Sequence, residues 1–381
     1  MSQMVFAQLK NGQPFEIDPR QLVRRHLLVI GQTGSGKTTS TLSLLSLLQQ
    51  TDFTTIILDP TGEYAKLPNA VTYRLGDNAY LEAGQFDVDQ LTDALQVHAD
   101  DLLKDRLVAA INDLRIQQNI HQQDTPYQKR GVKIDDYQAQ LSQLGDWAQT
   151  YNPQLLADQL IEEFIVPNDD QSADYSLLGQ RYYRQMINQE WYTLATIRQR
   201  LVSHEFQVLF DPDPASGTTK TEMNFVIKMF LEHRTTHRSL VIDLSALKEF
   251  GPGQGVVISA LLKHLLAIRL AGSNRFPVNI VLDEAHRYLP KDETELASNG
   301  IFQILREGRK VGLSMTLTTQ SPLDLPARLR SQFANLLIHH LTSPEELKSL
   351  AVADQVDLTD VSRLGVGEAL LLLDGQPAQQ L

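Results

Sequence analysis

The chain has 381 residues, 42% of them hydrophobic, which suffices for two or three domain-sized units with a sizeable core. It contains no cysteine, which excludes disulfides, thiolate zinc sites and cysteine catalysis. The net charge of −12 disfavours nucleic acid and anionic membranes, so any nucleic-acid contact needs a local basic patch. No signal peptide precedes Lys10, and apolar runs such as Glu368 to Asp374 are too short to span a bilayer. We therefore predict a cytoplasmic protein without a membrane partner.

The first residues, Met4 to Ile17, can form a hairpin at most. Beyond them, short apolar runs that mostly end in a polar residue recur: Leu27–Ile30, Thr55–Asp59, Ser239–Asp243, Val278–Asp283, Leu313–Gln320, Asn335–Leu341 and Ala369–Leu373. Such continuous runs are typical of strands buried on both faces of a parallel sheet. Helical patterns separate several of them; Leu42, Leu45 and Leu48, for example, fall on one helical stripe. The pattern predicts an α/β fold with a mostly parallel central sheet.

Residues 86–206 break this alternation, because they are polar, rich in Gln and Asp, and show helical spacing without a convincing strand. Their leucines suggest one amphipathic helix (Leu91, Leu95, Leu102, Leu103, Leu107) and others further on (Leu141, Leu144, Leu155, Leu156, Leu160). We interpret the segment as a helical insertion between the second and third strands. A domain with its own activity is the alternative, although no ligand-binding pattern is visible. The predicted organisation is a hairpin and the first part of the core (1–85), the insertion (86–206) and the second part of the core (207–381).

The first strand run leads into a glycine-rich segment, Gly31-Gln-Thr-Gly-Ser-Gly-Lys-Thr38, which matches the phosphate-binding loop pattern completely. Glycines let successive N–H groups point at phosphate oxygens, and the following helix adds its positive end. Lys37 would reach the β- and γ-phosphates, and the Thr38 hydroxyl would bind Mg²⁺. The predicted nucleotide-binding residues are Gly31, Gln32, Thr33, Gly34, Ser35, Gly36, Lys37, Thr38 and Thr39.

An acidic pair follows the strand run Val278 to Leu282. Asp283 would stand at the carboxyl edge of the sheet, where open α/β sheets bind ligands, as a direct or indirect partner of Mg²⁺. Glu284 would polarise the attacking water as general base. An acidic turn after a strand is the plainer alternative, but beside the phosphate loop the pair predicts a RecA-like P-loop NTPase that hydrolyses ATP with Mg²⁺.

Two further positions have both a catalytic and a structural interpretation. Gln320, at the end of its strand run, could contact the γ-phosphate or the water, or it could be an amide satisfied by nearby backbone. Arg306 and Arg309, three residues apart, would share the outward face of one helix end. They could be solvated charges favoured by the helix dipole, or one could serve the nucleotide of a neighbouring subunit.

Several motifs together resemble those of the HerA-type ATPases, in the HerA–FtsK branch of DNA translocases. The similar runs are Arg25 to Thr38, Asp59-Pro-Thr-Gly-Glu-Tyr64, Leu282-Asp-Glu-Ala-His-Arg-Tyr-Leu-Pro290 and Arg306-Glu-Gly-Arg-Lys-Val-Gly-Leu313. The resemblance extends from about Arg20 to Leu373. It implies a homohexameric ring with ATP between subunits and duplex DNA in the pore, with Glu63 near the catalytic site and Arg309 acting in trans.

The sequence departs from that family's pattern in three places. Only about two dozen residues precede the first sheet strand, where such proteins usually carry a β-barrel. Little chain follows the last strand for a bracing arm, and Gln320-Ser321-Pro322 stands where Gln-Arg-Pro is usual. Shortened proteins of this type resemble the motor half of a two-gene system, paired with a nuclease or another effector that helps defend against phage.

Three functions therefore remain open. The first is a ring-shaped DNA-translocating ATPase that works with a separate effector, and the second is an ATP-binding ring scaffold that activates an effector without moving DNA. The third is a secretion or conjugation motor. Candidate pore residues are the loop Lys248 to Gln254 and the pair Arg328 and Arg330, which a turn and solvated charges would explain equally well.

Overall fold

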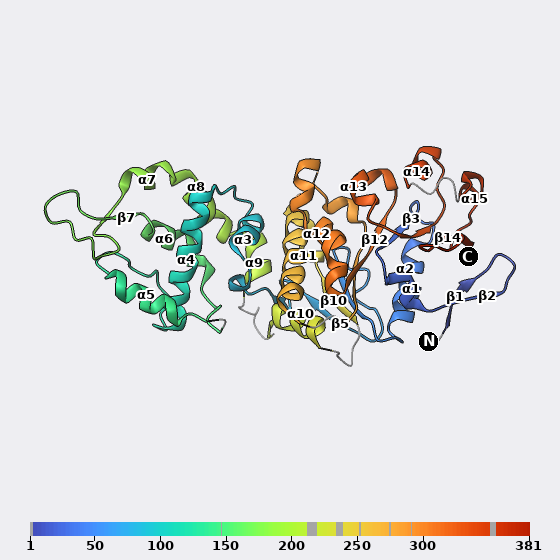
Figure 1. The fold of residues 1–381 in the computed structure, drawn as a ribbon, viewed down its shortest axis with the longest axis horizontal. Coiled ribbons are helices and arrows are strands. Elements are labelled where there is room, and N and C mark those ends of the chain that lie inside the picture. The colour runs from blue at the N-terminus through green and yellow to red at the C-terminus, as the bar shows by residue number, and fades with distance from the viewer. Residues whose placement is uncertain are drawn as a thin grey trace. The chain divides into compact units, whose positions relative to one another are not determined.

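The computed structural model describes residues 3–145, 147–211, 219–233, 239–250, 253–273, 276–290, 292–350 and 356–381. The chain forms two compact units (Figure 1). Unit 1 comprises Met1–Leu75 and Phe225–Leu381, and unit 2 comprises Gly76–Asn224. The predicted insertion, 86–206, lies within unit 2.

Unit 1 is built on a sheet of nine strands in the order β15-β14-β13-β3-β12-β11-β4-β10-β5. Seven neighbouring strands, from β13 to β5, run parallel, whereas β14 pairs antiparallel with both β13 and β15. This arrangement confirms the predicted α/β fold. The strands are β3 (Leu27–Ile30), β4 (Thr54–Asp59), β5 (Ala70–Arg74), β10 (Ser239–Asp243), β11 (Val278–Leu282), β12 (Leu313–Thr319), β13 (Asn335–Ile338), β14 (Leu370–Leu372) and β15 (Gln379–Gln380).

The strand β5 was not predicted from the sequence. It is an edge strand whose residues are only partly buried, so it lacks the continuous apolar run of the central strands. Unit 2 consequently follows the third strand of this sheet along the chain rather than the second. At the N-terminus, β1 (Met4–Gln8) and β2 (Pro14–Ile17) form the expected antiparallel hairpin.

Helices connect the strands and bury their apolar faces against the sheet. Leu45 of the helix after β3 packs with Ile57, Val241 and Val281 of three different strands. The helices are α1 (Pro19–Val23), α2 (Lys37–Leu48), α10 (Met223–Glu232), α11 (Gly253–Ala271), α12 (Gly300–Glu307), α13 (Ala327–Arg330), α14 (Pro344–Lys348) and α15 (Leu358–Ser362). Among the described residues, α11 is the helix long and apolar enough to cross a membrane by length and composition, a run that the sequence analysis overlooked. More than half of it is buried within the protein, as expected of a core helix.

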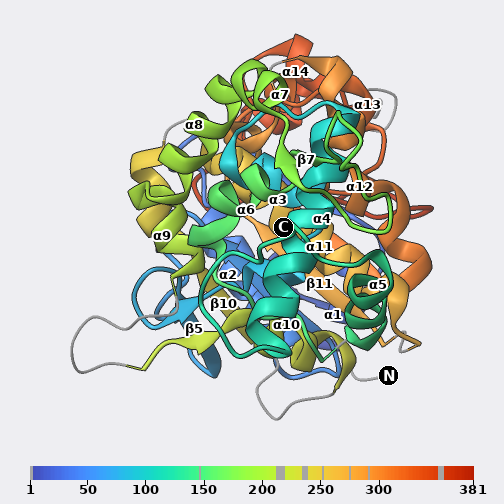
Figure 2. The ribbon, with the colours of Figure 1, turned by 90° about the vertical axis from the view of Figure 1, so that its left-hand side faces the viewer.

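Unit 2 is mainly helical (Figures 1 and 2). Its helices are α3 (Val88–Leu95), α4 (Asp101–Asn119), α5 (Ile134–Gln143), α6 (Leu156–Glu162), α7 (Arg184–Gln189), α8 (Trp191–Leu201) and α9 (His204–Phe210). The single helix predicted through Leu91 and Leu107 is wrong. Gln96 takes a left-handed conformation that ends α3, and Asp100 begins α4 by accepting a hydrogen bond from the Leu103 N–H at 2.9 Å. Two pairs of two-residue strands complete the unit: β6 (Ala79–Tyr80) with β9 (Thr221–Glu222), and β7 (Ile165–Val166) with β8 (Arg181–Tyr182).

A buried polar cluster lies inside unit 2. Lys129 forms ion pairs with Asp113, at 2.9 Å, and with Glu163. The Tyr137 hydroxyl donates to Asp113 at 2.6 Å, and the Gln159 amide donates to both carboxylates. Burial and the neighbouring Asp113 raise the pKa of Glu163 to about 8. Because one lysine faces two buried carboxylates, the cluster favours a protonated Glu163.

The net charge is distributed unevenly between the units. Residues 76–224 contain 24 Asp and Glu but 11 Lys and Arg, a net charge of −13, which leaves +1 for the rest of the chain. The acidic character that disfavours nucleic acid therefore belongs to unit 2 and not to the sheet-bearing unit.

Candidate nucleotide-binding site

The phosphate loop connects β3 to α2, and its glycines meet specific backbone demands. Gly34 and Gly36 have φ of 80° and 112°, which L side chains rarely adopt. At Gly31 a Cβ would lie 2.5 Å from the Cβ of His339. Gly36 is the N-cap of α2 and supplies no side-chain cap, so the first N–H groups of the helix remain available for an anion.

Lys37 is held over its own loop. Its buried side chain donates from Nζ to the carbonyl oxygens of Gly31, at 2.6 Å, and Gln32, at 3.3 Å. Burial lowers the pKa of Lys37, while the charges of Glu284 and Asp283 act to raise it. The structure thus brings Lys37 within electrostatic reach of the Asp283–Glu284 pair, which lies far from it in sequence.

The acidic pair is fixed by a threonine of the neighbouring strand. The Thr318 hydroxyl of β12 donates to Oδ1 of Asp283, and the N–H of Glu284 donates back to the Thr318 Oγ1 at 2.9 Å. Glu284 has a left-handed backbone, φ 48°, at the end of β11. Burial raises the pKa of Asp283, against the lowering effect of Thr318. Thr318 was not predicted from the sequence, where its only signal is a hydroxyl two residues before Gln320.

The carboxylate of Glu284 accepts a hydrogen bond at Oε1, while its buried Oε2 has no hydrogen-bond partner among the described residues. Gln320 donates from Nε2 to Oε1 at 3.3 Å, and His286 Nδ1 lies 3.4 Å from Oε2. The Thr319 hydroxyl lies 3.3 Å from the same His286 nitrogen. A role for His286 was not predicted from the sequence, although it lies two residues beyond Glu284. These contacts hold Glu284 at the carboxyl edge of the sheet, where the phosphate loop lies.

Asp59 organises the loop after β4, a role that sequence reasoning did not give it. Its buried carboxylate accepts four bonds at Oδ1, from the N–H groups of Thr61, Gly62 and Glu63 and from the Thr61 hydroxyl. Its Oδ2 accepts from the N–H of Tyr64 at 2.8 Å. The loop places Glu63 within electrostatic reach of the acidic pair. Burial raises the pKa of the Glu63 carboxyl, and the negative charge of Asp283 raises it further.

The donor set fits Mg²⁺ bound together with a nucleotide. In the described part of the chain, no group of three His, Cys, Asp or Glu is arranged to hold a metal by itself. Mg²⁺ in nucleotide sites takes one or two protein oxygens, and phosphates and water supply the remainder. Thr38, in the first turn of α2, and Asp283 would hold it, and the ion would neutralise phosphate charge when bound.

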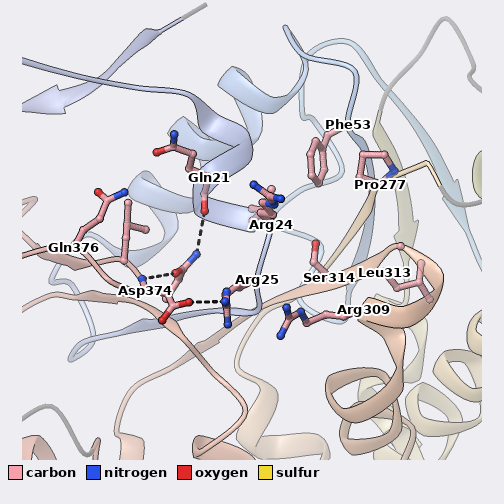
Figure 3. A pocket seen from close by; sticks show the side chains of 14 residues that line it. Gln21, Arg24, Arg25, Phe53, Pro277, Arg309, Leu313, Ser314, Asp374 and Gln376 are labelled. Atoms are coloured by element: carbon pink, nitrogen blue, oxygen red, sulfur yellow. Dashed lines mark hydrogen bonds and ion pairs between the residues drawn. The ribbon is translucent and has the colours of Figure 1, made fainter. Parts of the chain in front are cut away.

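Arg309 lies at the other edge of the sheet. The helix α12 ends at Glu307, so Arg309 falls in the adjoining 3₁₀ turn Gly308–Val311, and Arg306 and Arg309 are both exposed. It lines a pocket of about 700 Å³ together with Arg24 and Arg25 (Figure 3). Arg25 pairs with Asp374 there at 2.6 Å.

The length of β12 separates this pocket from the phosphate loop. Arg309 precedes β12, whereas Lys37 follows the parallel strand β3. Seven residues of extended chain span about 20 Å, too far for an arginine side chain to bridge. Arg309 therefore cannot reach the phosphate loop of its own chain.

The predicted pore residues have local roles in the structure. Lys248 donates from Nζ to the carbonyl of Thr61 at 2.7 Å and so braces the Asp59 loop; Gly251 and Pro252 lie outside the described residues. Arg330 donates to two backbone carbonyls, whereas the Arg328 guanidinium lies 5.7 Å from the ring centroid of Phe302. The Arg306 guanidinium lies 5.6 Å from the centroid of the same ring. Arg306 and Arg328 are thus two neighbouring exposed cations of unit 1.

The sheet and the site define a P-loop nucleotide-binding protein of the RecA-like fold. Solved structures share this fold. VirB4 of Thermoanaerobacter pseudethanolicus aligns over 100% of this chain and 96% of its own with a TM-score of 0.65 and 14% identity. The plasmid coupling protein TrwB, solved with a non-hydrolysable ATP analogue, aligns over 98% and 88% with a TM-score of 0.58 and 17% identity.

The family model described as the central domain of the helicase HerA matches residues 6–265, and the chain belongs to this family. A probable helicase of Methanocaldococcus jannaschii is 23% identical over 94% of this chain and 61% of its own length. The DNA double-strand break repair helicase HerA of Saccharolobus solfataricus is 32% identical over 35% of this chain and 28% of its own length. The chain thus spans less than two thirds of either relative.

Proposed function

We propose that the chain hydrolyses ATP with Mg²⁺ and is one subunit of a ring-forming motor that translocates duplex DNA. The observation that carries the proposal is the meeting of Lys37 with Asp283 and Glu284 at the phosphate loop. We propose further that the motor acts with a nuclease or another effector, in DNA processing or defence against phage, and that it works in the cytoplasm.

Each residue would have one role in hydrolysis. Lys37 would offset the charge of the β- and γ-phosphates, and the free N–H groups at the start of α2 would bind their oxygens. Glu284, oriented by Gln320 and His286, would accept a proton from the attacking water. Glu63 would add a carboxylate beside the acidic pair, and its neighbours favour its neutral form.

The placement of Arg309 supports an assembly of several subunits. Arg309 lies too far from the phosphate loop of its own chain to contact a nucleotide there. The nucleotide that it could serve is therefore one bound to a neighbouring subunit. The likeness to HerA supports a homohexamer, in which ATP would lie between subunits. Such a ring would form closed, head-to-tail interfaces, each with one phosphate loop and one Arg309 pocket.

The division of charge favours unit 1 as the DNA-contacting unit. Its net charge is near zero, and Arg306 and Arg328 present cations for phosphates beside Phe302. Unit 2, with a net charge of −13, would repel DNA.

A second candidate function is a ring scaffold that activates an effector without moving DNA. It is favoured by exposed aromatic residues in the acidic unit 2: Trp147, Tyr175, Tyr183, Trp191 and Tyr192. A third candidate function, a secretion or conjugation motor, is supported by the fold that the chain shares with VirB4 and TrwB.

The decisive experiment measures ATP hydrolysis with and without duplex DNA across a salt series. For a translocase, duplex DNA should stimulate the rate, and the stimulation should weaken steeply as salt rises. Lys37→Ala should abolish nucleotide binding, because the phosphates lose their main cationic partner. Hydrolysis indifferent to DNA, alone and with the effector, would instead favour the scaffold. The Arg306→Ala/Arg328→Ala variant should then retain full effector activation, whereas a translocase would lose it.

A further inference from the structure

A turn near the C-terminus lies directly against the phosphate loop. The N–H of Gly367 donates to the carbonyl of Ser35 at 2.9 Å. A Cβ placed on Gly36 would lie 3.0 Å from the backbone N and Cα of Gly367. The two segments therefore meet backbone to backbone at the start of α2. A side chain at Gly36 would therefore force the two segments apart, whereas a Cβ on Gly367 would meet nothing within 4 Å.

The turn Gly365–Glu368 is held rigidly. The N–H of Glu368 donates to the Gly365 carbonyl at 3.1 Å, and the N–H of Gly365 donates to Oε2 of Glu368 at 2.8 Å. Gly367 has φ 86°, as the third residue of a type II turn requires. The buried His339 ring, with Nδ1 2.9 Å from the Glu368 carbonyl, fixes the turn from beneath. At its tip, the Val366 side chain is 85% exposed.

The sheet order determines on which side of the phosphate loop this turn lies. The strand β3 stands between β12 and β13. Gln320 and the acidic pair follow β12 and β11, on one side of β3, whereas the turn precedes β14, which pairs with β13 on the other. A nucleotide with its γ-phosphate at Lys37 and Glu284 would extend its remaining groups away from these carboxylates. That direction leads toward Val366.

We infer that Val366 forms the platform on which the nucleoside of a bound nucleotide rests, through apolar contact with the face of the base. The inference rests on the proposed ATP binding and adds the element that distinguishes a nucleotide from a bare polyphosphate. The N–H groups of Gly365, Gly367 and Glu368 already have acceptors, so these three cannot donate to the edge of the base. Because adenine and guanine both present an aromatic face, an apolar contact with Val366 should bind their nucleotides about equally.

The test compares Mg²⁺ complexes of ATP, GTP and inorganic tripolyphosphate by titration calorimetry, with the full chain and Val366→Ser. The substitution should weaken the binding of ATP and of GTP by about fourfold each, the effect of losing roughly one methylene of apolar burial. Affinity for tripolyphosphate should be unchanged, because it has no nucleoside. Val202→Ser is the matched control, since Val202 is also exposed, at 60%, but lies at the end of α8 in unit 2.

The outcomes separate this inference from the proposed function. If wild-type protein binds neither ATP nor tripolyphosphate, the proposed function fails. If it binds both and Val366→Ser leaves ATP unchanged, or weakens tripolyphosphate equally, the platform is refuted while ATP binding stands. If Val366→Ser loses affinity for only one of the two nucleotides, the contact is not a purely apolar one with the face of the base, and the inference is refuted. An 8-azido-ATP photolabel should map to the peptide containing Val366, and labelling elsewhere alone would overturn the inference.

Discussion

Gln320 Nε2 donates a hydrogen bond to Glu284 Oε1 at 3.3 Å, which joins the carboxyl ends of β12 and β11. The amide can orient the carboxylate without removing its negative charge, and His286 stands 3.4 Å from the second oxygen. A carboxylate restrained in this way keeps one orientation while a water molecule approaches. The arrangement is what a general base beside a phosphate loop requires.

The first prediction concerns Glu284→Gln. The side-chain oxygen of glutamine can still accept the bond from Gln320, so ATP affinity should persist, but it cannot take the proton from water. Single-turnover hydrolysis should fall by about 10²–10⁴-fold, the usual contribution of a general base. Glu293→Gln is the control, because Glu293 is exposed in the following segment. A normal rate in Glu284→Gln would exclude Glu284 as the base.

The second prediction concerns Asp59→Ala. The loss of one carboxylate leaves the backbone N–H groups of Thr61, Gly62 and Tyr64 without their acceptor, so stability should fall by about 2–4 kcal/mol. Hydrolysis should fall as well, because Glu63 is no longer held near Asp283. Chemical denaturation measures the first effect, and Glu63→Gln, which leaves those bonds intact, isolates the second. Unchanged stability in Asp59→Ala would contradict the organising role of the Asp59 carboxylate.

The parallel core was predictable because its strands are buried on both faces and leave continuous apolar runs. Leu27–Ile30 and Val278–Leu282 are buried throughout, and the predicted strands there coincide with β3 and β11 almost residue for residue. The edge strand β5 is only partly buried along its length and left no such run. Burial on two faces is thus what made a strand visible in the sequence.

The candidate site was predictable where a residue type has one dominant chemical use, as at Lys37 and Glu284. The roles of Asp59 and Thr318 were not predicted, because both residues accept or donate hydrogen bonds within the fold, which many residues at strand ends can do. The position of Val366 was hidden for a different reason. It depends on the pairing of β14 beside β13, which brings a distant turn to the phosphate loop.

The third prediction concerns pH and unit 2. Burial and Asp113 raise the pKa of Glu163 from 4.5 to about 8, so the folded state binds a proton that the unfolded state releases. This contribution to stability is full below pH 4.5 and is lost as pH rises toward 8. The melting temperature of unit 2 should therefore fall between pH 5 and pH 8, and Glu163→Gln should flatten the dependence.

Tryptophan fluorescence can follow that transition selectively, because both tryptophans of the chain, Trp147 and Trp191, belong to unit 2. Glu190→Gln is the matched control, since it removes a carboxylate of the same unit outside the cluster. A pH dependence equally steep in Glu163→Gln would show that another group carries it.

The last prediction tests whether Arg309 acts across a subunit interface. Arg309→Ala and Lys37→Ala subunits should each be inactive alone, since one lacks the arginine and the other cannot bind the phosphates. In a random equal mixture, about a quarter of head-to-tail interfaces would join an intact Lys37 to an intact Arg309 of the next subunit. ATP hydrolysis should recover accordingly, and Lys310→Ala, which removes the adjacent exposed cation, should keep its activity alone. A double variant lacking both side chains, mixed with Arg309→Ala, should give no recovery, because no subunit then supplies the arginine. Mixtures shown by native mass to co-assemble but without recovered hydrolysis would place Arg309 outside the catalytic interface.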